Sequence, residues 1–226
     1  MALILAQTPL CEAIISSPEI IPVINRFGIT LGIGDKTIEC ICTSNRLDTD
    51  FFLSILNTYI NEDYFPEKAL ESFHISTLVE YLRKTNNYYL RYHLPTLERH
   101  FNLLIERSGN HNNLGIMMSF FKEVKHDIES RITFDFEQWF PTILNITKGE
   151  NAQTISIPDD SYIIEDKLND LKSMFIRHIS GDYDENLCYA VISSIIAIEN
   201  DIKQNNRIRD RIVLRLYNNL TNNQQK

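Results

Sequence analysis

A heptad stripe near the end of the chain constrains the fold more than any other feature of the sequence. Between Ile196 and Tyr217 the chain reads IAIENDIKQNNRIRDRIVLRLY. Positions separated alternately by four and three residues in this region are Val191, Ile195, Ile198, Ile202, Asn205, Arg209, Ile212 and Leu216. Six of these eight side chains are aliphatic, which is the pattern of a helix that buries one face against other helices. The stripe therefore predicts a helical bundle with an asparagine and an arginine buried in its middle.

Three other long segments, at about 72–107, 113–146 and 162–179, carry stripes of the same kind. The second segment has Met117, Phe121, Val124, Ile128, Arg131 and Asp135, and the third has Ser161, Ile164, Leu168, Leu171 and Phe175. The first contributes Leu78 and Leu82 and then the pair Asn86-Asn87, with a bend expected near Pro95. Long helices with one apolar stripe each favour an antiparallel four-helix bundle, which we expect over residues 67–226.

Residues 1–66 have a different pattern, and we expect them to form a separate small helical module. Ser17-Pro18 and Gly28 bound one predicted helix, and TIECICTSN and LDTDFFLSILNTYI are two more. Helix, short turn, helix is the outline of a helix-turn-helix unit. The segment has three basic and eight acidic residues, however, a net charge of −5. Because phosphate contacts need a basic surface, we expect no direct binding of nucleic acid.

The composition of the whole chain narrows the class of protein further. The net charge is −8, and no stretch of about 18 apolar residues indicates a membrane span. The opening MALILAQTPL is too short for a signal peptide, so we expect a cytoplasmic protein without membrane contact. The four cysteines lack a zinc or disulfide spacing, and we expect them to be small buried hydrophobic residues.

Several segments, in order along most of the chain, resemble the hemerythrin-like proteins of the iron-centre repair (di-iron) family, especially a Bacteroidota branch. PVINRFGITLGIGDKTIECIC resembles the N-terminal module of that family. YLRKTNNYYLRYHLPTLE resembles its first bundle helix, FDFEQWFP the end of its second, IEDKLNDLKSMF its third and ENDIKQNNRIRDRIVLRL its fourth. The resemblance implies a hemerythrin-like bundle with a di-iron site, held by histidines and bridging carboxylates from all four helices.

The chain departs from this family at the ligand positions. The matching residues here are Asn87 (Asn86 if the register shifts by one), Arg131, Asp135, Ser161, Asn205 and Arg209, with His111 as a further match at loose spacing. Gly32-Ile33 stands where the family's N-terminal module has a Cys-Cys pair. Arginine has no lone pair for a metal, and iron ligation needs imidazole or carboxylate. We therefore expect a polar core without a cofactor, in which Asp135 pairs with Arg131 or Arg209.

The remaining histidines leave a relocated metal site open. Glu123-x-x-His126 has the spacing of a di-iron element, but Val124 rather than His126 lies on the stripe, so a solvated face is the simpler interpretation. His93 and His100 share one helical face, and we expect them to be half-buried and hydrogen-bonded. His178 is expected to end its helix, where the dipole favours a cation. The sequence does not decide whether His93, His100, His111 and His126 assemble around a metal.

These observations favour a degenerate hemerythrin-like protein that is metal-free, non-enzymatic and acts as a regulatory or protein-interaction module. The partners we expect are an intact relative, a transcription regulator or a second copy in a homodimer. A run of basic residues (Lys203, Arg207, Arg209, Arg211, Arg215) is either a solvated face or a docking patch for an acidic partner. The alternative is a working di-iron protein for iron–sulfur centre repair or for sensing oxygen or nitric oxide under stress.

Overall fold

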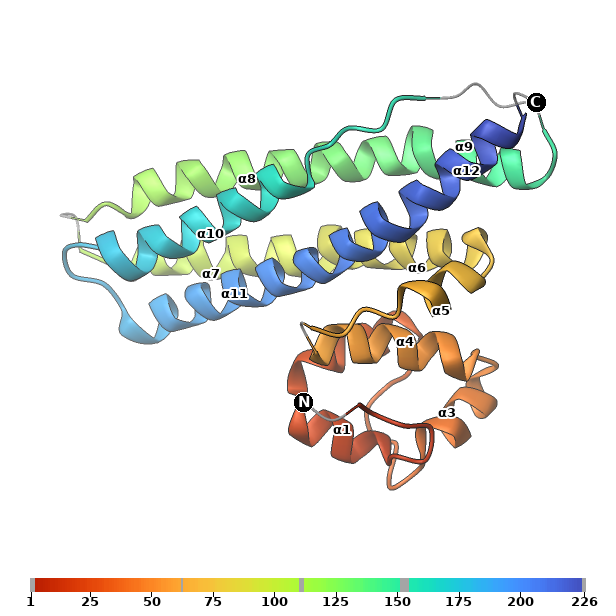
Figure 1. The fold of residues 1–226 in the computed structure, drawn as a ribbon. Coiled ribbons are helices and arrows are strands. Elements are labelled where there is room, and N and C mark those ends of the chain that lie inside the picture. The colour runs from red at the N-terminus through yellow and green to blue at the C-terminus, as the bar shows by residue number, and fades with distance from the viewer. Residues whose placement is uncertain (1–2, 62, 110–111, 151–154, 225–226) are drawn as a thin grey trace. The chain divides into compact units, whose positions relative to one another are not determined.

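The structure is a computed structural model that describes residues 3–61, 63–109, 112–150 and 155–224 (Figure 1). Within these ranges the chain is helical, apart from one isolated antiparallel bridge between Pro9 and Thr37. The prediction of an all-α protein is therefore confirmed. None of the helices in the described part of the chain combines the length and the apolar character that a membrane crossing requires.

The chain forms two compact units. The first unit ends at Tyr81 and takes in the later segment Arg207–Asn219, and the second comprises Leu82–Asn206 and begins again at Leu220. The C-terminal part of the chain therefore contributes to both units. The boundary at residue 66 that the sequence suggested stays a prediction.

The first unit is built from short helices with side-chain caps at two of their starts. Its elements are α1 (Leu10–Ser16), η1 (Pro18–Ile20), α2 (Ile21–Arg26), α3 (Ile38–Asn45), α4 (Thr49–Ile60), α5 (Glu67–Ser72) and the first half of α6 (Ile75–Tyr88). Thr37 Oγ1 accepts the amide of Cys40, and Asp48 Oδ1 accepts the amide of Phe51 at 2.8 Å. These caps satisfy amides that have no partner inside the helix, which is why α3 and α4 begin where the sequence predicted.

Four long helical segments agree with the predicted segments within a few residues and provide the bundle of the second unit, although the beginning of α6 and residues 207–219 belong to the first unit. The first continues from α6 through η2 (Tyr89–His93) to α7 (Leu94–Arg107), and the second runs through α8 (Leu114–Phe134), η3 (Asp135–Trp139) and α9 (Phe140–Thr147). The third is α10 (Ser161–His178), and the fourth runs through α11 (Glu185–Ile208), η4 (Arg209–Val213) and α12 (Leu214–Gln224). Figure 1 shows α7, α8, α10 and α11 side by side.

The bundle core contains the apolar stripes that the sequence predicted. Side chains from α7, α8, α10 and α11 form one buried cluster, which includes Phe101, Phe121, Phe175, Val191, Ile195, Ile198 and Ile202. On the fourth helix, all the predicted positions from Val191 to Ile212 are buried, and Leu216 is half-buried. The heptad spacing thus predicted correctly which faces of the helices are buried.

Three of the four long helical segments change from α to π conformation for one turn. Leu94 N–H bonds Tyr89 O in η2, and Phe140 N–H bonds Asp135 O in η3, both five residues back. Pro95 and Pro141 follow directly, and a proline ring would clash with the carbonyl four residues before it in a regular helix. The wider π turn removes that clash, so the bend expected at Pro95 is a π segment. No proline explains η4.

Candidate functional site

Polar side chains are buried along the axis of the bundle in the second unit. We define the polar core as Asn86, Arg131, Asp135, Asp201, Asn205 and Asn206, all of which are buried. Asn86 lies on α6, Arg131 on α8, Asp135 at the first position of η3, and the other three lie on α11. Buried polar groups and charges are tolerated when they are hydrogen-bonded to one another, so the contacts of this group decide what it can do.

The first contact joins α6 to η3. Asn86 Nδ2 donates to Asp135 Oδ2 at 3.1 Å, and both residues are buried. Asn87 is half-buried, so of the two registers that the sequence left open, the structure puts Asn86 in the core. An amide that donates to a buried carboxylate stabilises the charged form of that carboxylate without adding a charge of its own.

The second contact is a chain of hydrogen bonds across α8, α11 and α10. Arg131 NH1 donates to Asn206 Oδ1 at 2.9 Å, and Asn206 Nδ2 donates to Glu165 Oε1 at 2.6 Å. The same Asn206 nitrogen lies 3.4 Å from the carbonyl oxygen of Ser161, which is how the predicted position Ser161 meets the polar core. One asparagine therefore connects the buried guanidinium with a carboxylate on another helix.

The third contact centres on Asn205. Its Nδ2 donates to Tyr89 OH at 2.6 Å and to the Asp201 carboxylate at 3.0 Å. The other carboxylate oxygen of Asp201 lies 3.6 Å from His93 Nε2. Asn205, predicted as a core position, thus holds the start of η2 against α11.

Arg209, the last predicted position, belongs to the first unit. Its side chain is buried, and NH1 donates to Asp210 Oδ1 at 2.8 Å. Arg131 and Asp135 both lie in the polar core, and each is hydrogen-bonded to an asparagine. The expected ion pair of Asp135 with one of these arginines stays a prediction.

The basic run on the fourth helix makes contacts inside the first unit. Arg207 and Arg211 lie over the ring of Phe65, with their guanidinium carbons 4.7 and 4.4 Å from its centroid. Arg211 and Arg215 form ion pairs with Glu67, and Arg215 also pairs with Glu71 at 2.8 Å. These arginines contact α5 and the segment before it, so fewer basic side chains of the run are available to an acidic partner.

The histidines are spread over separate environments. His93 and His100 are both half-buried as expected; His100 Nδ1 is hydrogen-bonded to Ser194 Oγ at 3.4 Å, and His93 Nε2 lies 3.6 Å from an Asp201 carboxylate oxygen. His126 is exposed, and His178 ends α10. His111 lies outside the described residues. Among the residues the structure describes, no three or more His, Cys, Asp or Glu side chains gather closely enough to hold a metal.

The donor set of the polar core does not fit a di-iron centre. Asp135 and Asp201 supply carboxylates, but their oxygens are already bonded to Asn86 and Asn205. Arg131 adds a fixed positive charge and no lone pair. Iron sites in bundles are built from several carboxylates and imidazoles that converge. We therefore assign no metal chemistry to these residues.

The cysteines follow the expectation only in part. Cys42 and Cys188 are buried, and burial raises the pKa of both thiols. Cys11 is half-buried, and Cys40 is exposed on α3, so the prediction of burial was wrong for Cys40. On a helix of eight residues, Cys40 and Cys42 lie on different faces, and only one of them can point into the core.

Sequence reasoning missed three contributors to the polar core: Tyr89, Asp201 and Asn206. Asn206 is the neighbour of a predicted position, and Asp201 precedes Asn205 by one helical turn. A search for polar residues four apart on α11 would have found the pair 201 and 205.

None of the family models, curated proteins and solved structures with which the chain was compared matches it.

Proposed function

We propose that this protein is a degenerate, metal-free hemerythrin-like bundle that acts as a protein-interaction module rather than as an enzyme. The observation that supports this proposal is the hydrogen bonding of the polar core. Where the resemblance would put imidazole and carboxylate ligands, Asn205 bonds Tyr89 and Asp201, and Arg131 bonds Asn206. These groups hydrogen-bond one another across the bundle.

The buried polar residues of the polar core also have a structural role that needs no metal. Four bonds of the polar core join different segments of the bundle: Asn86 to Asp135, Asn206 to Arg131 and to Glu165, and Asn205 to Tyr89. A register shift of one helix would leave buried polar groups without partners, at about 1–3 kcal/mol each. The network therefore favours one alignment of the helices, a role well attested for buried asparagines.

A protein-interaction module needs an exposed surface for its partner, and the outer face of α11 has the composition of a protein interface. Its exposed residues between 186 and 200 are Asn186, Tyr189, Ile196, Ala197 and Asn200, none of which is charged. Glu199, the single charged residue in that span, pairs with Lys172 at 2.6 Å. Interface cores are depleted in charge and enriched in aromatic side chains such as Tyr189, which is 74% exposed.

We assign this face to a second copy of the chain. Two copies each carrying a net charge of −8 repel one another, so an uncharged face is where they meet at the lowest electrostatic cost. Twofold dimers, in which the same patch of each subunit meets, are also the commonest oligomers.

Sedimentation velocity of the wild type and of surface variants tests the interaction face. Sedimentation velocity over a range of concentrations should show a monomer–dimer equilibrium that Tyr189→Glu and Ile196→Glu abolish. Ile176→Glu is the matched control, because Ile176 is 62% exposed but lies on α10. A wild-type monomer at every concentration would exclude the second copy, and a complex with another protein that depends on Tyr189 would assign the face to that protein.

The metal-free part of the proposal is tested separately. After dialysis against a chelator, elemental analysis should find no stoichiometric iron, and ferrous iron should leave the melting temperature unchanged, since tight binding would raise it by mass action. Two irons per chain would support the alternative of di-iron repair or gas sensing. Asp135→Asn and His126→Asn would then show whether the iron sits in the polar core or at a relocated site.

A further inference from the structure

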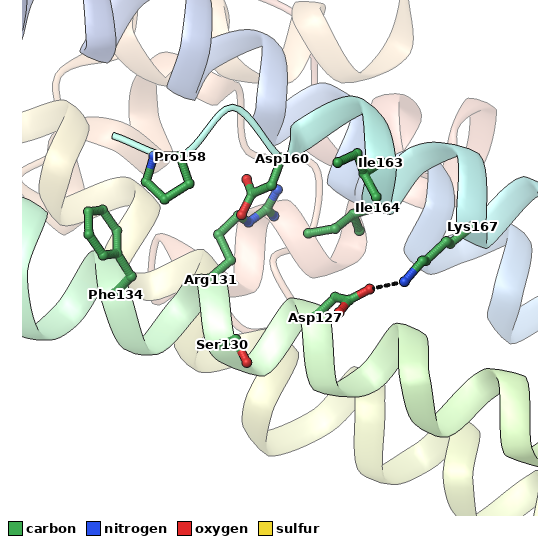
Figure 2. Close-up of a pocket in the computed structure, with 9 residues that line it drawn as sticks. All are labelled: Asp127, Ser130, Arg131, Phe134, Pro158, Asp160, Ile163, Ile164 and Lys167. Atoms are coloured by element: carbon green, nitrogen blue, oxygen red, sulfur yellow. Dashed lines mark hydrogen bonds and ion pairs between the residues drawn. The ribbon is translucent and has the colours of Figure 1, made fainter. Parts of the chain in front are cut away.

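A cavity of about 320 Å³ opens between α8 and the start of α10 in the second unit (Figure 2). Its walls include the apolar side chains of Phe134, Pro158 and Ile163 and the charged side chains of Arg131, Asp160 and Lys167. This volume is at the small end of the range for ligand sites, about 300–1,000 Å³. The cavity therefore suits a small molecule that presents both apolar and charged surface.

Asp160 is the residue that points to a ligand. It stands at the N-cap of α10, where an aspartate normally accepts a backbone amide of the first turn, yet its side chain makes no cap hydrogen bond. Its Oδ1 is buried, and within the described part of the chain no donor reaches that oxygen. A carboxylate with a buried, unpaired oxygen costs free energy, and an ammonium group that binds the same carboxylate lowers that cost.

Positive charge lies in the same cavity. Figure 2 shows the Asp160 carboxylate and the Arg131 guanidinium directed into the same part of the space, from the loop before α10 and from α8. Lys167 lies farther along α10, where its Nζ is 2.5 Å from Asp127 Oδ2. A ligand that spans the cavity would meet a carboxylate, a guanidinium and an apolar wall.

We propose that this cavity binds a small zwitterion, a free α-amino acid with an apolar side chain. Its ammonium group forms an ion pair with the Asp160 carboxylate, and its carboxylate accepts from Arg131, the side chain best suited to a planar anion. Its apolar body lies against Phe134, Pro158 and Ile163. Because Arg131 also bonds Asn206, the ligand contacts a residue of the polar core. This proposal goes beyond the interaction function and does not depend on it.

Matched probes test the two charges separately. L-leucine carries both groups, L-leucinol lacks the carboxylate, and 4-methylpentanoate lacks the ammonium group. Hydrogen bonds to charged groups are worth about 1.5–3 kcal/mol, which corresponds to roughly 10- to 150-fold in affinity. Isothermal titration with the full chain should show L-leucine binding at least about tenfold more tightly than either analogue. Equal binding of the three probes, or no binding of L-leucine, would overturn the proposal.

A pair of adjacent aspartates supplies the matched variants. Asp160→Asn should weaken L-leucine by about tenfold or more and should not weaken 4-methylpentanoate, since that probe has no ammonium group and its carboxylate is repelled by Asp160. Asp159→Asn removes the same charge from an exposed neighbour and should leave both affinities unchanged. Circular dichroism verifies that both variants are folded. If the two variants weaken L-leucine equally, the effect is a general loss of charge, and the assignment to Asp160 fails.

Discussion

The hydrogen bond between Asn86 and Asp135 allows a quantitative test of the polar core. The perturbation is a double-mutant cycle in which Asn86 and Asp135 are replaced by leucine, singly and together. Leucine has the same number and branching of side-chain heavy atoms as either residue, so the cycle removes polarity and keeps a similar shape. Both residues are less than 10% exposed, and the bond length of 3.1 Å is that of an ordinary N–H···O bond.

The expected magnitudes follow from burial and charge. Asn86→Leu removes a donor from a buried carboxylate and should cost about 1.5–3 kcal/mol. Asp135→Leu leaves the Asn86 amide without its acceptor, at about 1–3 kcal/mol, and the cost rises to about 3–5 kcal/mol if Asp135 also balances an arginine. The double variant should lose less than the sum, because neither polar group is then left behind. We expect an interaction energy of about 1–3 kcal/mol.

Urea unfolding followed by tryptophan fluorescence provides the measurement. Trp139, the single tryptophan, is fully buried in η3, the π segment that Asp135 begins, so its emission reports on this part of the bundle. Asn87→Leu is the control, since Asn87 is half-buried and its change should stay within about 0.5 kcal/mol. An interaction energy below about 0.5 kcal/mol would refute a buried, bonded pair.

Three further predictions concern other parts of the chain. Alkylation at pH 8 should modify the exposed Cys40 in the native protein. Burial raises the pKa of Cys42 and of Cys188, so these two thiols should react only in denaturant, and mass spectrometry of the peptides checks this. The hydrogen bond from Lys125 to Glu98 raises the pKa of Lys125, so its stabilisation is complete below the ordinary lysine pKa of 10.5 and is lost as the pH rises through the folded value. Wild type and Glu98→Gln should accordingly converge in urea stability at strongly alkaline pH, and a constant difference would contradict that coupling. Phe65→Leu should accelerate amide hydrogen exchange in α5, because it removes the ring beneath Arg207 and Arg211, while exchange in α8 stays unchanged.

The helices and their inward faces could be predicted from the sequence because both are local properties. Apolar spacing identified the four long segments, and TIECICTSN and LDTDFFLSILNTYI, which the sequence predicted as helices, contain α3 and α4. The same spacing placed Arg131, Asp135, Ser161, Asn205 and Arg209 inside, and all five are buried. The match to the family left Asn86 and Asn87 open, because the two are adjacent and its register could shift by one; the structure buries Asn86.

The sequence by itself determined that this chain is helical, which residues face inward, and that the inward faces carry polar groups. Tertiary structure decided the partners of those groups: Asn86 with Asp135, Asn206 with Arg131, and Asn205 with Tyr89, a residue 116 positions away. It also decided that Arg207, Arg211 and Arg215 contact α5 or the segment before it. The physical reason is that a buried polar side chain must find a partner within about 3 Å, and which side chains come that close depends on how the helices pack, not on their spacing along the chain.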